Sequence, residues 1–178
     1  MQDKDIVADA LSSPDALSRF LRTVEPFIYQ TAYYLTGKKA DAEDITQESL
    51  WKVCRSLGQY QGQGSLRGWI HRVVVNTFRQ QLRKKRLTVV ELDEAMQSSE
   101  SSVEQQIEWK LTEEHLQKAI AALPSNYREV VVLRHVHEMS YLEIAEVLEL
   151  TEAQVKTRLF RGREKLKTLF YGGDQDDA

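Results

Sequence analysis

The chain has 178 residues and a formal net charge of −3 at pH 7, from 24 basic and 27 acidic residues. This length allows one medium domain or two small ones and excludes a large barrel. Taken alone, the acidic balance argues against a nucleic-acid-binding protein, which usually carries a basic excess. Three prolines and eight glycines leave room for long helices and little for a sandwich of short strands.

The charges are strongly segregated along the chain. Residues 49–86 hold nine basic residues and no acidic one, and residues 87–114 hold eight acidic residues and one basic one. Residues 151–170 carry a net charge of +4. Two basic blocks separated by an acidic one predict two surfaces that contact anions, on a chain that is nearly neutral on average.

The acidic block also predicts a domain boundary. Glu91 to Glu104 is rich in serine and glutamate and has few large apolar residues, so it cannot bury much surface. We therefore expect an all-α protein of two small helical domains joined by a flexible acidic linker. The expected ranges are a first domain at 15–86, the linker at 87–108 and a second domain at 109–171.

Residues 40–57 have the period of an amphipathic helix, with small and aliphatic residues on one side. The opposite side carries Asp44, Gln47, Glu48, Trp51 and Arg55. A large aromatic side chain inside a polar face is typical of an anchor residue at a protein interface. The alternative is that Trp51 packs on a neighbouring helix of its own domain.

Residues 66–86 predict a second long helix, in which one ridge is basic. At steps of four, three, four and three residues, the ridge carries Arg72, Asn76, Arg79, Arg83 and Arg86. Arginines contact phosphates, and an asparagine can hydrogen-bond a base edge. Trp69 at the edge of the ridge, with Tyr60 in the preceding glycine-rich loop, can stack on an unpaired base. The alternative is a solvated basic face, which the lack of acidic residues and the interleaved aromatics disfavour.

The C-terminal half contains two capping boxes eleven residues apart, Ser140 with Glu143 and Thr151 with Gln154. They predict a helix over 140–148, a turn at 149–150 and a second helix from Thr151, which is helix-turn-helix spacing. Upstream, residues 116–123 and 127–137 predict two more helices, separated at Pro124.

The second helix of this motif has a polar, basic outer face. That face and its flanks carry Gln154, Lys156, Thr157, Arg158, Phe160, Arg161 and Glu164. These side chains combine groups that read bases with groups that bind phosphates, and the first turns of such a helix enter the major groove. A generic helical hairpin is the alternative, which the basic character of this helix in a locally acidic domain disfavours.

Enzymatic and metal-binding functions find little support. The one candidate cluster is His135, His137 and Glu138, and positions i and i+2 of a helix point about 200° apart, so they cannot easily grip one ion. No phosphate loop, nucleophile motif or placed pair of carboxylates occurs. We expect no catalytic residue, metal or cofactor. Cys54 allows no internal disulfide, and its position at the edge of the apolar side favours a core residue over a redox sensor.

Two further expectations concern location. The N-terminal segment lacks the apolar core of a signal peptide. No stretch approaches the roughly 18 apolar residues that cross a bilayer. We therefore expect a cytoplasmic protein without direct membrane insertion.

Together the two halves resemble an extracytoplasmic-function (ECF) sigma factor of bacteria, from about residue 20 to 170. DAEDITQESLWKV and SLRGWIHRVVVNTFRQQLRKKR resemble sigma region 2, and the segment from ALPSNYREVV to RGREKLK resembles sigma region 4. The order and spacing of two separate motif blocks make the likeness specific. It departs from many relatives at Glu149, where they have glycine, and at Thr151 to Gln154, where they have Pro-x-Gly-Thr, so base preference at the helix start can differ.

The resemblance implies roles for these residues. In the family, the segment matching Asp44, Gln47 and Glu48 docks on the β′ clamp helices of core RNA polymerase, which gives an exposed Trp51 a purpose. The ridge with Trp69, Arg72, Asn76 and Arg79 falls where the minus-ten element is recognised and opened, next to residues 58–65, which correspond to a loop that holds a flipped base. The minus-thirty-five contacts fall on Lys156, Thr157, Phe160 and Arg161.

The resemblance also implies partners: core RNA polymerase, with its β flap on the outer surface of region 4, promoter DNA, and an anti-sigma factor that covers the same surfaces. The alternative from a different class is a helix-turn-helix regulator that binds duplex DNA alone. That alternative explains residues 140–167 and leaves residues 40–86 without a purpose.

Overall fold

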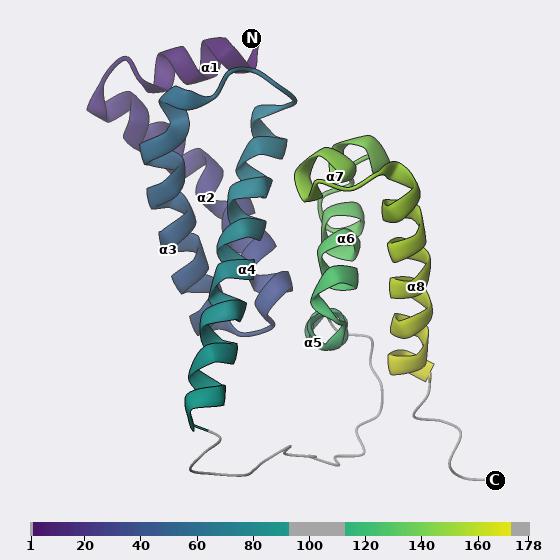
Figure 1. Ribbon diagram of the computed structural model, residues 1–178. Coiled ribbons are helices and arrows are strands. Elements are labelled where there is room, and N and C mark those ends of the chain that lie inside the picture. Colours follow the sequence, from purple (N-terminus) through teal and green to yellow (C-terminus); the bar gives the residue numbers. More distant parts are fainter. Residues whose placement is uncertain (1, 93–112, 172–178) are drawn as a thin grey trace, which may run out of the picture.

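The structure, a computed structural model, describes residues 2–92 and 113–171 (Figure 1). All regular elements in these ranges are helical, which confirms the predicted all-α class. They are α1 (Asp3–Ala10), α2 (Pro14–Thr36), α3 (Lys39–Ser56), the short 3₁₀ helix η1 (Leu57–Gln59), α4 (Leu66–Leu92), α5 (Glu113–Ala122), α6 (Ser125–His135), α7 (Tyr141–Leu148) and α8 (Glu152–Tyr171). None of the helices within those ranges is long and apolar enough to cross a bilayer.

The helices α1 to α4 form the first domain, in which α1 lies across one end of the other three (Figure 1). α2 begins at Ser13, whose hydroxyl accepts a hydrogen bond from the Ala16 amide, and Pro14 occupies its first turn. α2, α3 and α4 bury their apolar faces against one another. The fully buried side chains at their centre include Ile28, Leu35, Ile45, Val53, Leu57 and Ile70.

The helices α5 to α8 form the second domain. Ser140 and Glu143 form the predicted capping box of α7, and Thr151 and Gln154 exchange the same pair of hydrogen bonds at the start of α8. Glu149 ends α7 in the left-handed conformation, with φ of 58°, so the turn forms at a residue that is not glycine. The predicted helix-turn-helix is thereby confirmed.

Packing of α8 on α6 depends on a residue without a side chain. A Cβ atom at Gly162 would lie 2.9 Å from the Val131 Cγ2 atom of α6, closer than two carbon atoms normally approach. Val155 and Leu159 of α8 are buried on the same side. The missing side chain at Gly162 therefore lets α8 lie close against α6.

Several helix boundaries differ from the prediction, and two of the differences bear on the functional residues. α4 continues to Leu92, into the segment predicted as linker, and the remainder of that linker lies outside the described residues. The predicted helix over 127–137 is wrong at its end, because α6 stops at His135. The chain then turns: Glu138 takes a positive φ of 56°, and the Met139 amide donates to the Leu133 carbonyl. His137 is therefore not a helical residue, and the argument from helical positions i and i+2 does not apply to it.

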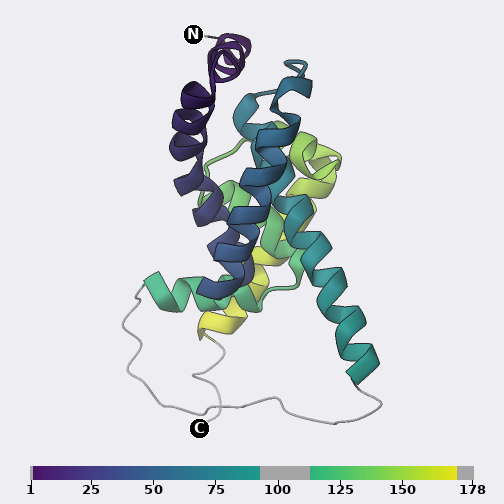
Figure 2. The ribbon, with the colours of Figure 1, turned by 90° about the vertical axis from the view of Figure 1, so that its left-hand side faces the viewer.

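The two domains pack against each other along α4, which has neighbours on both sides (Figures 1 and 2). α7 contacts α4, while α5 and α6 contact α2. The contact is close at Gly37, where a Cβ atom would lie 2.4 Å from the Ala121 Cβ atom of α5. Gly37 also has a φ of 74°, a conformation that glycine adopts without steric cost. Beyond this junction, the C-terminal end of α4 extends away from the other helices (Figure 2).

We predict that Leu159→Ala destabilises the second domain by about 2–5 kcal/mol, because this side chain is 1% exposed and its loss leaves a cavity between α8 and α6. Urea denaturation of the purified protein measures the loss. The matched control is Leu142→Ala, which removes the same atoms from a side chain that is 57% exposed, and should change stability by about 0.5 kcal/mol or less. Equal losses in both variants would contradict the packing described for α8.

Candidate functional site

The polar side of α3 presents a ridge to solvent. Asp44, Gln47, Trp51 and Arg55 are all exposed along it. The Trp51 ring is 57% exposed, and the Arg55 guanidinium lies over it, 4.6 Å from the ring centroid. The alternative in which Trp51 packs on another helix of its own domain is therefore wrong. The ridge therefore presents a large exposed aromatic ring, packed against an arginine, among polar side chains that can form hydrogen bonds.

Glu48 differs from its neighbours on the ridge because it braces the domain. Its carboxylate pairs with the Lys52 Nζ atom at 2.8 Å, and the same Nζ atom donates to Thr77 and Gln80 of α4. The hydrogen bond from Lys52 lowers the pKa of Glu48 below its ordinary value. Glu48 therefore remains ionised and links α3 to α4, while the rest of the ridge is available to a partner.

The loop before α4 is organised by two aromatic residues. Tyr60 and Trp69 have ring centroids 5.9 Å apart, and the Tyr60 hydroxyl donates to the Gly64 carbonyl at 2.8 Å. Burial, followed by the carboxylate of Asp3, raises the pKa of Tyr60. Asp3 also accepts a hydrogen bond from the Leu66 amide, so α1 helps to hold the start of α4. The structure thus brings together the two aromatic residues predicted to stack on a base.

The basic ridge of α4 is divided between solvent and the second domain. Asn76 and Arg83 are exposed. Arg72 donates to the backbone carbonyl of Glu146 on α7. Arg79 makes two hydrogen bonds to the carboxylate of Glu129 on α6, from Nε to Oε1 at 2.9 Å and from Nη2 to Oε2 at 2.6 Å. Two of the predicted DNA contacts are therefore engaged by the other domain in this conformation.

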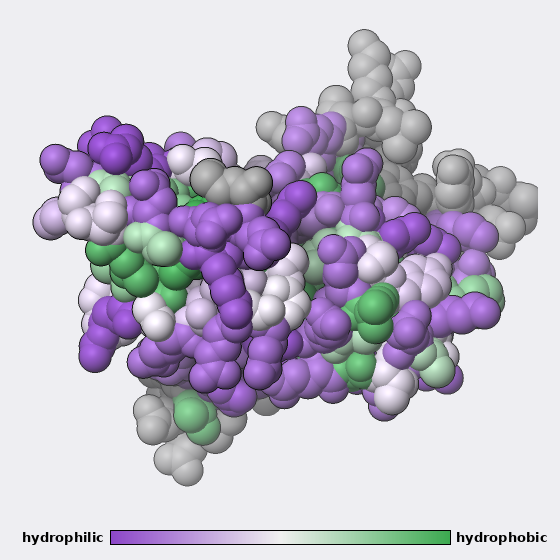
Figure 3. Space-filling view, turned by 90° about the horizontal axis from the view of Figure 1, so that it is seen from above, coloured by the Kyte–Doolittle hydropathy of each residue, from purple (hydrophilic) through white to green (hydrophobic). Residues whose placement is uncertain are grey.

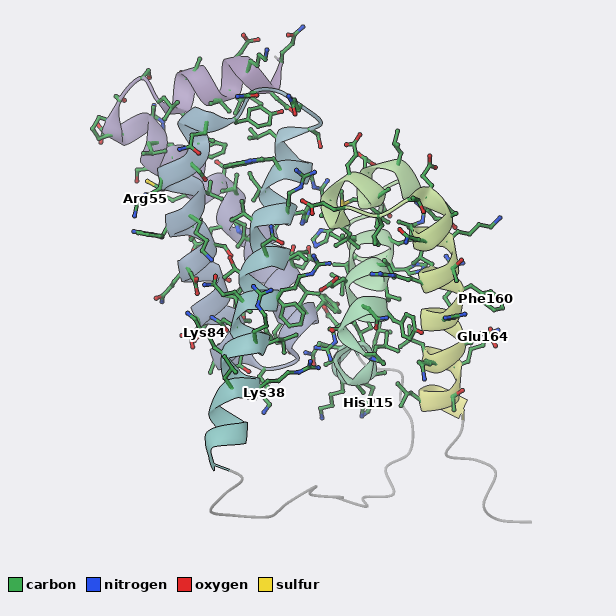
Figure 4. The ribbon with its side chains drawn as sticks, in the orientation of Figure 1. Lys38, Arg55, Lys84, His115, Phe160 and Glu164 are labelled. Atoms are coloured by element: carbon green, nitrogen blue, oxygen red, sulfur yellow. The ribbon has the colours of Figure 1, made fainter. Side chains whose placement is uncertain are left out.

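The outer face of α8 is open to solvent. Gln154, Lys156, Thr157, Phe160 and Arg161 are exposed, and Arg158 is half-buried. Phe160 is 66% exposed, and it points away from Arg55, so the α3 and α8 surfaces face opposite sides of the molecule (Figure 4). Gln154 uses its carbonyl oxygen in the capping box, which leaves its amide hydrogens to donate. Seen from above, hydrophilic residues cover most of both domains, with smaller apolar areas among them (Figure 3).

Comparisons with known proteins identify the family of this chain. Residues 20–88 match the family described as sigma-70 region 2, and residues 113–166 match sigma-70, region 4. The ECF RNA polymerase sigma factor SigW of Bacillus subtilis is 30% identical over 165 residues, which are 86% of this chain and 88% of SigW. The chain belongs to the ECF family of RNA polymerase sigma factors.

Other relatives agree with this assignment. The ECF sigma factor SigE of Mycolicibacterium smegmatis is 35% identical over 79% of this chain, which spans 56% of the length of SigE. Two solved structures share the fold. The sigma factor RpoE of Bartonella quintana, in complex with the anti-sigma factor NepR, has a TM-score of 0.72 at 24% identity and covers 87% of this chain and 96% of its own. CnrH, in complex with the cytosolic domain of CnrY, has a TM-score of 0.69 at 23% identity and covers 96% and 97%.

The Arg79–Glu129 pair connects region 2 to region 4 of this ECF sigma factor. The Glu129 side chain is 3% exposed, whereas Arg79 is one-third exposed. The hydrogen bonds to Glu129 raise the pKa of Arg79. A bidentate pair of this kind compensates a carboxylate that is otherwise costly to bury. We call the contacts between α2 and α4 of region 2 and α5 to α7 of region 4 the interregion seam.

Apart from Arg72 and Arg79, the residues of the seam were not identified as functional from the sequence. A signal for four of them was present: His71, Val74, Val75 and Phe78 are spaced as a second buried stripe on α4, and all are buried. Glu129 gave no such signal, because an acidic residue in the first turns of a helix normally faces solvent. Among the described residues, no three histidine, cysteine, aspartate or glutamate side chains gather as a metal site.

We predict that Arg79→Met lowers the free energy of unfolding by about 1–3 kcal/mol, because it leaves the buried Glu129 carboxylate without its partner. Arg83→Met is the control, since it removes an exposed cation from the same ridge and should cost about 0.5 kcal/mol or less. Adding Glu129→Gln to Arg79→Met should recover part of the loss. Urea denaturation measures all three, and an equal effect of Arg79→Met and Arg83→Met would contradict a structural role for the pair.

Proposed function

We propose that this sigma factor binds core RNA polymerase, directs it to promoters through a minus-ten and a minus-thirty-five element, and helps to open the DNA for initiation. The domains would be region 2 at 15–86 and region 4 at 109–171. The factor acts in the cytoplasm as a binding subunit, with no catalytic residue, metal or cofactor of its own. The observation that supports this best is that the exposed ridge of α3 and the basic ridge of α4 lie on a domain separate from the helix-turn-helix.

Core polymerase is assigned to the α3 ridge. Asp44 and Gln47 offer hydrogen-bonding groups one turn apart on the helix. The exposed Trp51 ring would become buried on binding and anchor the interface. We assign the β′ clamp helices to this ridge and the β flap to the outer surface of region 4. Glu48 contributes by holding α3 against α4 through Lys52.

The minus-ten element is assigned to α4 and its preceding loop. Asn76 faces solvent in the middle of the ridge, with Arg72, Arg79 and Arg83 positioned to contact phosphates around it. Extruding a base costs a few kcal/mol. Stacking on Tyr60 and Trp69 can offset about 1–3 kcal/mol per base. The α4 surface thus binds unpaired bases that would otherwise pair again as the duplex closes.

The minus-thirty-five element is assigned to the exposed face of α8. In this docking the first turns of α8 enter the major groove, so Gln154, Thr157 and Phe160 meet base edges. Lys156, Arg158 and Arg161 flank them and contact phosphates. Because much of the affinity comes from phosphate neutralisation, DNA binding should fall steeply with salt.

Recognition of both elements requires the regions to separate. The two elements are centred about 25 base pairs apart, or about 85 Å at 3.4 Å per base pair. Regions that contact each other across the seam cannot reach both sites at once. The 20 residues from 93 to 112 can span at most about 70 Å, which is less than 85 Å, so the width of the two regions themselves would have to cover the remaining distance. Separation also frees Arg72 and Arg79 from region 4.

We also assign an anti-sigma factor as a partner. The sigma factor RpoE, which shares this fold, was solved with the anti-sigma factor NepR, and CnrH, of the same fold, was solved with the cytosolic domain of CnrY. The exposed ridge of α3 and the open face of α8 are the surfaces that such a partner would have to cover to prevent transcription.

Run-off transcription with core RNA polymerase on a randomised promoter library tests the function. We expect transcripts above those of core polymerase alone, from templates that share two sequence elements. A factor that binds duplex DNA but adds no transcripts would instead fit a regulator that acts without replacing sigma.

We predict that Trp51→Ala weakens binding to core polymerase about 30-fold, equivalent to about 2 kcal/mol, because it removes the exposed aromatic anchor of α3. Fluorescence anisotropy of the labelled factor measures the affinity. Leu11→Ala is the control, since it truncates another exposed apolar side chain of the same domain away from the α3 ridge. Similar affinities for Trp51→Ala and the unmodified protein would remove the basis for this assignment.

We predict different outcomes for two exposed residues of the α4 ridge. Asn76→Ala should weaken opening only at certain minus-ten sequences, because an amide reads a base edge. Arg83→Ala should weaken DNA binding at all sequences and reduce the slope of log K against log salt by about one, because it removes a phosphate contact. Permanganate footprinting and salt titrations on promoter variants measure these effects. Equal losses for both variants on every promoter would count against the assigned roles.

A further inference from the structure

A buried polar cluster lies at the interregion seam. It consists of Thr31 on α2, His71 on α4, and His137 in the turn after α6. The Thr31 Oγ1 atom lies 2.8 Å from His137 Nε2 and 3.3 Å from His71 Nδ1. The two imidazole rings are 4.3 Å apart between centroids. His71 and Thr31 are fully buried and His137 nearly so, although Thr31 and His137 are 106 positions apart in the chain.

The hydrogen bonds determine which ring nitrogens carry hydrogen. The Thr31 hydroxyl has one hydrogen, which it donates to the Phe27 carbonyl at 2.7 Å. Toward both imidazoles Thr31 is therefore an acceptor, so His71 Nδ1 and His137 Nε2 are the protonated nitrogens. The remaining nitrogens, His71 Nε2 and His137 Nδ1, are buried and have no hydrogen-bond partner. The cluster thus accommodates two neutral imidazoles, and a further proton on either ring would have no acceptor.

Among the charged groups nearby, one cation opposes protonation of both rings. Arg67 of α4 is the cation whose field acts on both rings. From α2 the neighbours are Thr31 and the Phe27 ring, which are uncharged. From region 4, the carboxylates of Glu138 and Glu143 line a shallow pocket beside His137, together with Arg67. Burial is the largest cause that lowers the pKa of both histidines, to about 3 for His71 and about 4 for His137.

We propose that this histidine pair makes the closed packing of region 4 on region 2 sensitive to pH, so that acidification separates the regions. Because separation frees Arg72 and Arg79, the consequence for promoter binding rests on the function proposed above for the α4 ridge. The pair lies where the regions meet: His71 belongs to region 2, His137 belongs to region 4, and both contact Thr31 of region 2. Its protonation therefore acts on the contact between the regions.

The sign of the effect follows from the two states. A histidine exposed in the open form has a pKa of about 6.5, whereas both values are lower in the closed form. The open form therefore binds more protons below about pH 6.5, and the closed form loses stability as the pH falls from there toward 4. Two such groups raise the open-to-closed ratio about 100-fold between pH 7.5 and 5.5, and a single one raises it about 10-fold.

Single-molecule energy transfer on the full chain measures this ratio directly. Dyes are placed on Glu43→Cys in α3 and Lys165→Cys in α8, both exposed, in a Cys54→Ser background. We expect the open-to-closed ratio to rise about 100-fold from pH 7.5 to 5.5. In the variant His71→Asn with His137→Gln, amide groups retain the donors to Thr31 and do not titrate, so the ratio should be nearly independent of pH. His135→Gln is the control, since this histidine bonds Arg163 within region 4 and should leave the response unchanged.

Two outcomes overturn the proposal: a ratio that does not change between pH 7.5 and 5.5, or a double variant that responds as steeply as the unmodified protein. If circular dichroism shows that the double variant does not fold, imidazole nitrogen NMR of the unmodified protein replaces it. Protonation of His71 and His137 should then coincide with opening, and titration near pH 6.5 in a closed molecule would overturn the proposal. These measurements use neither polymerase nor DNA. A negative result would overturn the pH proposal without affecting the proposed function, and a lack of transcription at pH 7.5 would overturn the proposed function without affecting these measurements.

Discussion

The ion pair between Arg79 and Glu129 joins the basic ridge of region 2 to the interior of region 4. Because the Glu129 carboxylate is almost fully buried, it needs the guanidinium for charge compensation as long as the regions are closed. In the proposed function, a phosphate of promoter DNA needs the same guanidinium. The two interactions would then exclude each other, and the stability of the closed form would oppose DNA binding by the free factor. The net charge of −3 does not reveal the basic surfaces of α4 and α8, because acidic segments elsewhere in the chain offset their charge.

The seam combines apolar and polar contacts. Val74, Val75 and Phe78 of α4 are buried there, and polar groups cross it as well: Arg128 donates to the Leu35 carbonyl, Gln117 donates to the Tyr33 carbonyl, and the Tyr34 hydroxyl donates to Glu113. Water can replace such partners when the regions part, whereas exposing an apolar core has no compensation. The polar contacts of this junction suit the proposed change from a closed to an extended form on the polymerase.

Features set by local chemistry could be predicted from the sequence. The capping boxes at Ser140 and Thr151 are sufficient to place the turn, and the helical period is sufficient to place Trp51 on a polar face. The seam could not be predicted in this way, because helical periodicity reports only that a face is buried and not which partner covers it. For this reason the sequence did not identify His71 as a seam residue. His137 was predicted to be helical, because the neighbouring sequence contains no glycine or other signal for the positive φ at Glu138. The DNA and polymerase contacts remain predictions that rest on exposure and on family membership.

In the proposed function, the closed seam has to open before the factor can act. Energy transfer between dyes on α3 and α8, recorded as core RNA polymerase is added at pH 7.5, tests it most directly. We predict that binding of core polymerase shifts the whole population from a short to a long distance between the dyes, and that promoter DNA alone does not. A complex that initiates transcription while the dyes stay at the short distance would contradict the account.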